Sequence, residues 1–147
     1  MENTPLTKQY KNSFPLSAGI RNEKLRDEIY CQLANQTRKN GDPQSNERGW
    51  FLISNCLSSF PPSKTLYKYL LKYVSDNGAN GYKYICQQKL LQAGINHESR
   101  VYPPTNLEWH SNKKAVRMAL DATFPDFEIR PVPIESFTTQ RSFLLMR

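Results

Sequence analysis

The fold is decided by residues 25–74, which read LRDEIYCQLANQTRKNGDPQSNERGWFLISNCLSSFPPSKTLYKYLLKYV. Apolar residues recur in this stretch at steps of three and four, the spacing that places side chains on one face of a helix. Helices joined by short connections must bury these faces against one another, so the stretch predicts a helical bundle. The three predicted stripes are Leu25, Ile29 and Leu33; Trp50, Ile53, Leu57 and Phe60; and Leu66, Leu70 and Val74.

Polar and helix-breaking residues mark where these helices are expected to begin and end. Asn22 is a candidate N-cap for the first helix, and Ser45 or Asn46 is expected to cap the second. The Pro61-Pro62 corner ends the second helix, because the residue before a proline is pushed out of helical geometry. Ser63 can then cap the third helix at once. A fourth helix is predicted from the stripe Tyr82, Ile85, Cys86 and Leu90.

The two ends of the chain follow other patterns. Residues 1–20 lack a clean apolar stripe, so we expect mostly irregular structure there, with a short helix near Thr7–Ser13. Apolar and polar residues alternate over 116–124, which predicts a half-buried strand. A turn and a second strand follow, and Pro131 and Pro133 keep that strand short or at a sheet edge.

Composition favours a basic, single-domain protein with polyanionic partners. A chain of 147 residues is about one domain long, and its net charge is +7. Such a surplus suits nucleic acid, anionic lipid or an acidic filament, although simple solubility explains it equally well. The sequence contains neither a run long enough to span a bilayer nor a signal peptide, so we expect a cytosolic protein.

The residue types that carry chemistry do not form a recognisable site. Cys31, Cys56 and Cys86 are widely spaced, and His97 and His110 stand alone, so neither a metal nor a cofactor is expected. We interpret the three cysteines as buried free thiols in a reducing compartment. P-loop, dinucleotide, nucleophile-elbow and zinc-protease motifs are also missing, which predicts a protein that is not an enzyme.

A row of lysines is the main candidate for a partner-binding surface. Lys64, Lys68 and Lys72 lie at positions i, i+4 and i+8, so they share one helix face and repel one another. A negatively charged partner would relieve that repulsion, whereas an ordinary solvated face needs no partner. Tyrosines beside these lysines could stack nucleic-acid bases, or simply pack between helices. Possible neighbours across the corner are Lys83, Lys89 and Arg100.

Residues 25–37 and 48–74 resemble the signature of the myosin tail homology 4 domain, and the likeness covers roughly residues 20–110. This all-helical module occurs in unconventional myosin tails, plant-type kinesins and PH-domain scaffold proteins, usually directly before a FERM domain. PPTNLEWHSNKK (103–114) resembles the linker into FERM. The alternating segment after it is similar to the opening hairpin of the ubiquitin-like first FERM lobe, and Thr138-Thr139 matches the start of that lobe's helix.

The chain departs from this family in two places. Members usually carry further core helices before the LRDEIYCQL segment, so we expect the short N-terminus to reflect a truncated or alternatively spliced product. A glycine is usual in the hairpin turn, where this chain has Phe127.

The resemblance implies a mainly α fold, namely an amphipathic helical bundle with a short C-terminal β-hairpin. The expected organisation is an irregular N-terminus (1–20), the helical bundle (21–110) and a partial ubiquitin-like lobe (111–147). The implied function is non-catalytic attachment in the cytoplasm to microtubules, another acidic cytoskeletal surface, or cargo and adaptor peptides. Two alternatives remain open: a basic helical nucleic-acid-binding module, and a structural spacer that orients an adjacent FERM domain.

Overall fold

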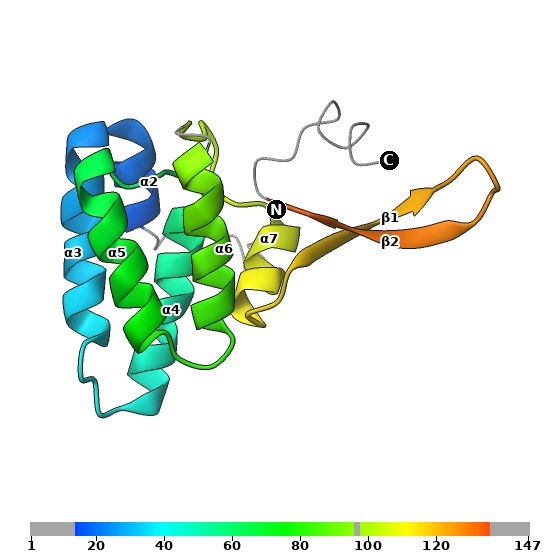
Figure 1. The fold of residues 1–147 in the computed structure, drawn as a ribbon. Coiled ribbons are helices and arrows are strands. Elements are labelled where there is room, and N and C mark those ends of the chain that lie inside the picture. The colour runs from blue at the N-terminus through cyan, green and yellow to red at the C-terminus, as the bar shows by residue number, and fades with distance from the viewer. Residues whose placement is uncertain (1–13, 96–97, 136–147) are drawn as a thin grey trace, which may run out of the picture.

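Helices make up most of residues 14–95 and 98–135, the part of the chain that the computed structural model describes (Figure 1). A helical bundle is followed by an antiparallel hairpin that projects away from it. In chain order the elements are α2 (Phe14–Arg21), the 3-10 helix η1 (Glu23–Leu25), α3 (Arg26–Thr37), α4 (Pro43–Leu57), α5 (Lys64–Asn77), α6 (Tyr82–Ile95), α7 (Asn106–Lys113), β1 (Met118–Thr123) and β2 (Ile129–Ile134). The predicted fold class, a bundle with a C-terminal hairpin, is confirmed.

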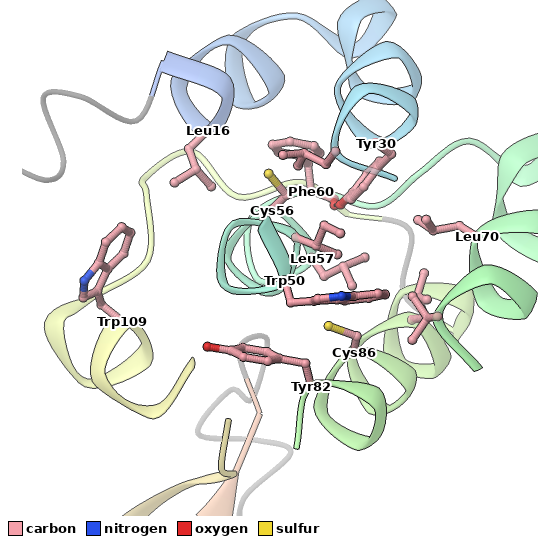
Figure 2. Packing of buried hydrophobic residues seen from close by; sticks show 14 residues of the cluster. Leu16, Tyr30, Trp50, Cys56, Leu57, Phe60, Leu70, Tyr82, Cys86 and Trp109 are labelled. Carbon is pink, nitrogen blue, oxygen red and sulfur yellow. The ribbon is translucent and has the colours of Figure 1, made fainter. Parts of the chain in front are cut away.

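Helix α4 lies at the centre of the bundle, with α2, α3, α6 and α7 packed around it. Its second half and the segment that follows are buried without interruption from Ile53 to Pro62. Figure 2 shows the core side chains gathered around this helix. Trp50 stacks on Tyr73 of α5 with 5.8 Å between ring centroids. The buried half of this helix requires apolar faces on its neighbours, and the predicted stripes supply those of α3 and α6.

Aromatic pairs fix how α3 and α7 sit against α4. Tyr30 meets Phe60 edge to face at 5.5 Å between centroids, and its hydroxyl donates to the Phe60 carbonyl at 2.5 Å. Burial raises the pKa of Tyr30 well above its ordinary value, so the phenol stays protonated and keeps donating. Phe51 meets Trp109 of α7 at 4.7 Å between centroids. Such pairs contribute roughly 1 kcal/mol beyond the burial of their area.

The first helix begins differently from the prediction. Asn22 does act as a cap, but it caps η1, where its side chain accepts from the Lys24 N–H at 3.1 Å. Because Leu25 ends that 3-10 turn, it leaves the α3 stripe and stays 41% exposed. Leu33 is buried as expected.

The N-cap of helix α4 lies three residues before Ser45, the first of the two predicted caps, which is a correction. Asp42 is the N-cap, and its carboxylate accepts from the Gln44 N–H at 3.3 Å. Pro43 occupies the first turn, where its missing N–H costs no hydrogen bond. The Asp-Pro pair is therefore a helix start and not only a turn.

The interpretation of residues 1–20 as irregular fails from Phe14 onward, where α2 begins. Leu16 of this helix is fully buried in the core, and Gly19 lies against the Phe60 ring. A Cβ on Gly19 would stand 2.2 Å from that ring, so only glycine allows this approach. Pro15 falls in the first turn, where it is tolerated. The helix expected near Thr7–Ser13 lies outside the described residues.

Helix α7 was not predicted, because residues 106–109 were interpreted as part of a linker. A capping box starts it: the Thr105 side chain accepts from the Glu108 N–H, and the Glu108 carboxylate accepts from the Thr105 N–H at 2.7 Å. Trp109 then enters the core. The bundle therefore includes a segment that the resemblance assigned to the connection into FERM.

The hairpin pairs β1 with β2 in antiparallel register, with Met118 opposite Ile134 and Thr123 opposite Ile129. Met118 is buried near α7, whereas most of the sheet is exposed. Phe127 occupies the turn with a φ of 61°, the left-handed region that favours glycine. The final helix expected from Ser136 lies outside the described residues.

The cysteines follow the prediction at two positions. Cys56 and Cys86 are buried, and desolvation raises the pKa of Cys86 to about 12 and that of Cys56 further still. Cys31 is exposed on α3, which corrects the expectation that all three thiols are buried. Desolvation and the nearby Glu28 and Asp27 carboxylates raise its pKa as well.

We predict that Leu16→Ala lowers the free energy of unfolding by about 3 kcal/mol, because it leaves a cavity where α2 meets the core. Phe14→Ala is the matched control in the same helix, since that ring is 78% exposed, and its effect should stay below about 0.5 kcal/mol. Urea unfolding followed by circular dichroism measures both. Equal effects would show that α2 does not belong to the bundle.

We predict that iodoacetamide modifies Cys31 alone in the folded protein, and all three cysteines in guanidinium. The thiolate is the reactive form, so the raised pKa of Cys31 keeps its modification rate low at pH 7. The rate should still be rising above pH 9, the ordinary pKa of a cysteine thiol. Intact-mass and peptide mass spectrometry count the labels. Modification of Cys56 or Cys86 at the rate of Cys31 would contradict this packing.

Candidate partner-binding surface

Two contacts between α3 and α5 position the lysine row. At the start of α5, the Ser63 N–H and hydroxyl donate to the Asp27 carboxylate at 2.8 and 2.5 Å. Near its end, the Tyr73 hydroxyl donates to the Ala34 carbonyl at 2.9 Å and lies 2.7 Å from the Thr37 hydroxyl. The two helices are thus joined at both ends, and they lie side by side in Figure 1.

The predicted row lies on the outside of α5. Lys64, Lys68 and Lys72 are all exposed. The Lys72 ammonium donates to Asp76, one turn further along, at 2.8 Å, and this hydrogen bond raises the pKa of Lys72. The cationic form of this lysine is therefore favoured at every physiological pH.

A groove of about 930 Å³ runs between α3 and α5 and is lined by Lys68 and Lys72. Arg38 and Lys39, at the C-terminal end of α3, line its other side. Sequence reasoning had assigned these two residues only to the end of the helix. The sequence shows that both residues are positively charged. It does not show that they lie near the lysine row, because that distance depends on how α3 packs against α5.

Of the three further candidates, Lys89 and Arg100 are turned to other contacts, whereas Lys83 lies beside Gly78 at the end of α5. Lys83 is exposed on α6, whereas Lys89 is partly buried, and desolvation lowers its pKa. Arg100 is committed to an internal ion pair with Glu108, and their side chains are 19% and 5% exposed. The structure therefore keeps the lysine row together and separates Lys89 and Arg100 from it.

Arg100 belongs to a polar network at the buried end of α4. Its backbone N–H donates to the Ser59 carbonyl at 2.8 Å, and its guanidinium donates to the Ser58 carbonyl at 3.3 Å. Asn112 of α7 donates to the Asn55 side chain at 3.0 Å and to the Ser58 hydroxyl at 3.1 Å. A positive side chain at a helix C-terminus also complements the helix dipole.

The tyrosines around this corner divide into packing residues and exposed ones. Tyr82 is buried, its hydroxyl donates to the Lys113 carbonyl at 3.3 Å, and desolvation raises its pKa to about 12. Tyr69 and Tyr84 are 73% and 51% exposed, on α5 and α6. Tyr69 also lines the groove. A continuous platform for stacking several bases is therefore not assembled there.

Within residues 14–95 and 98–135, no group of three or more histidine, cysteine, aspartate or glutamate side chains is arranged to hold a metal ion. Across the same residues no helix is long and apolar enough to cross a membrane.

A model of the MyTH4 domain family matches residues 13–111. Human unconventional myosin-XV is 40% identical over 133 residues, which are 86% of this chain and 4% of that protein. Myosin-VIIa of Drosophila melanogaster is 33% identical over 141 residues, 96% of this chain and 6% of that protein. The chain thus spans only a small part of the curated relatives it matches.

Solved structures of myosin tails share the fold. The C-terminal MyTH4-FERM domain of human myosin 7b, solved in complex with the harmonin-a PDZ3 domain, has a TM-score of 0.74 and 25% identity, and the match covers 88% of this chain and 27% of that one. The MyTH4-FERM MF1 domain of Dictyostelium discoideum myosin VII has a TM-score of 0.73 and 28% identity, covering 95% and 31%.

We predict that Arg100→Gln lowers the free energy of unfolding by about 3 kcal/mol, because it leaves the Glu108 carboxylate buried without its counter-charge. Lys72→Gln, which breaks the exposed pair with Asp76, is the control and should leave the urea midpoint unchanged. Chemical unfolding of both variants measures the difference. Equal midpoints would mean that Arg100 is a surface charge after all.

Proposed function

The chain belongs to the MyTH4 domain family, and we propose that it attaches a motor or scaffold protein to microtubules or another acidic cytoskeletal surface in the cytoplasm. The domain is a non-catalytic module of the kind found in myosin tails. What remains to be identified is the surface that it recognises.

The exposed row of Lys64, Lys68 and Lys72 carries the proposal. These ammonium groups project from one helix, and Arg38 and Lys39 add to the same side of the bundle. Like charges so close together repel, and an acidic surface converts that repulsion into attraction. Attraction between exposed charges is screened over about 10 Å at 0.1 M salt, so binding should weaken steeply as salt rises.

Binding of cargo or adaptor peptides is the second part of the proposal. The MyTH4-FERM domain of human myosin 7b was solved with a PDZ domain bound, which supports protein partners for modules of this architecture. A partial ubiquitin-like lobe after α7 would place such partners next to the bundle.

We predict that the chain sediments with taxol-stabilised microtubules at low salt, and that the pelleted fraction falls steeply as salt is raised. Lys64→Glu/Lys68→Glu/Lys72→Glu should reduce the pelleted fraction at low salt by about fivefold or more, because it replaces attraction with repulsion. Co-sedimentation over a salt series measures both, with circular dichroism to show that the variant is folded.

The matched control is Arg48→Glu/Lys113→Glu/Lys114→Glu, which makes the same change in net charge at exposed positions of α4 and around the end of α7. This control should retain most of the binding. Wild type that never pellets would exclude the cytoskeletal function. Salt-sensitive binding to nucleic acid with a strand or sequence preference would favour the nucleic-acid alternative, and no binding to any polyanion would favour the spacer.

A further inference from the structure

We propose that Asn40, in the connection between α3 and α4, is a modification site at which the chain converts its own asparagine to aspartate and isoaspartate, with water as the co-reactant. The inference is independent of the proposed function, because it concerns the covalent chemistry of the chain itself. It rests on how the structure holds three Asn-Gly pairs that are alike in sequence.

The three pairs are Asn40-Gly41, Asn77-Gly78 and Asn80-Gly81. In each, the backbone nitrogen of the glycine can lose its proton to hydroxide and attack the side-chain Cγ of the asparagine. The bond from Cγ to the side-chain nitrogen then breaks, and that nitrogen takes up a proton and leaves as ammonia. Water opens the resulting cyclic imide at either carbonyl, which gives aspartate or isoaspartate. Glycine favours the attack because it has no Cβ to obstruct it.

The pair at the end of α5 is held against this reaction. The Asn77 side chain donates to the Tyr73 carbonyl at 3.0 Å, which turns the amide back toward the helix. The Gly78 N–H donates to the Val74 carbonyl at 2.9 Å. The attacking nitrogen and the carbon that it must reach are therefore both engaged with the preceding helical turn.

The pair before α6 is held by packing. Asn80 has a φ of 50°, and a Cβ on Gly81 would lie 2.9 Å from the Ala115 carbonyl oxygen. The Gly81 carbonyl also accepts from the Ile85 N–H at 3.3 Å. Closing the imide ring would require the backbone to rotate against these contacts, so this pair must open before it can react.

Asn40 is arranged for the attack. Its Oδ1 accepts from the Asp42 N–H at 3.0 Å, which closes a turn around Gly41. This turn folds Cγ back over the Gly41 peptide, from which the attacking nitrogen comes. A Cβ on Gly41 would meet nothing within 4 Å, so the backbone there is free to rotate as the ring closes.

The hydrogen bonds of Asn40 also serve both ends of the reacting amide. Attack on Cγ places negative charge on Oδ1, and the Asp42 N–H that already donates to this oxygen would stabilise that charge. The leaving nitrogen, Nδ2, lies 3.2 Å from the Ser45 hydroxyl. Once this nitrogen becomes tetrahedral it has a lone pair, and the Ser45 O–H is placed to donate a proton to it.

Conversion would alter the end of α3. The Asn40 side chain donates to the Gln36 carbonyl at 3.0 Å, and a carboxylate cannot make this bond. The new negative charge would lie at the C-terminal end of a helix, where the helix dipole disfavours anions. It would also follow Arg38 and Lys39 directly in the chain and lower the local positive charge. Isoaspartate would further lengthen the main chain before the N-cap of α4.

The test is incubation of the full chain at mildly alkaline pH, followed by tryptic peptide mapping with liquid chromatography and mass spectrometry. Trypsin releases Asn40 in the peptide 40–48 and the other two pairs together in the peptide 73–83. In the folded protein the first peptide should convert about tenfold or more faster, because the other pairs must open first. In guanidinium the second should convert at least as fast, since it holds two pairs. The rate at Asn40 should rise with pH, because the Gly41 nitrogen must lose a proton.

Two variants separate the local geometry from the sequence. Ser45→Ala should slow conversion of Asn40 about threefold in the folded protein and leave it unchanged in guanidinium, because it removes the proton donor that only the fold positions. Gly41→Ala should slow it about tenfold in both conditions, since the added Cβ obstructs the attack and the fold has room for it. Gln44→Ala, at a neighbouring exposed position, is the control and should leave both rates unchanged.

Three outcomes would overturn the assignment. They are equal conversion of the two peptides in the folded protein, conversion of the peptide 40–48 at Asn46 instead of Asn40, and a Ser45→Ala variant that reacts like wild type in the folded state.

Discussion

The burial of the C-terminal half of α4 constrains the rest of the structure. A helix end leaves carbonyl groups without partners, and burying them unpaired would be costly. Here Arg100 donates to the Ser58 and Ser59 carbonyls, and Asn112 donates to Asn55 and the Ser58 hydroxyl. Residues 100–112 are therefore required to complete the core, although they lie some forty positions after the helix that they cap.

The same packing divides the cationic side chains into buried and exposed ones. Arg100 lies in the interior with Glu108 as its counter-ion, and Lys89 is partly buried. Arg100 and Lys89 therefore contribute little to the positive electrostatic potential at the protein surface. On α5, Lys72 makes an exposed pair with Asp76, which water and salt weaken readily. A net charge counted over the sequence therefore overstates the cationic surface, because it counts Lys89 and Arg100 in the same way as the exposed lysines of α5.

The sequence predicted those helices whose apolar residues recur with a regular helical period. The stripes around Trp50 and Val74 are buried as predicted, because a helical period depends only on neighbouring residues. It missed α2, since Pro15 and Gly19 suggest breaks until Gly19 is seen to be the close contact with Phe60. It also missed α7, although Thr105 followed by Glu108 is a capping box that a closer inspection of the sequence could have found.

The candidate surface was predictable on one side only. A row at i, i+4 and i+8 is a property of one helix, so the spacing of Lys68 and Lys72 alone is enough to place them on a common face. The opposite side of the groove, with Arg38 and Lys39, arises from tertiary contact. Tyr73 reaches across to the end of α3, and that contact brings Arg38 beside the row. The composition of this groove therefore depends on the packing of α3 against α5 and not on the sequence of one helix alone.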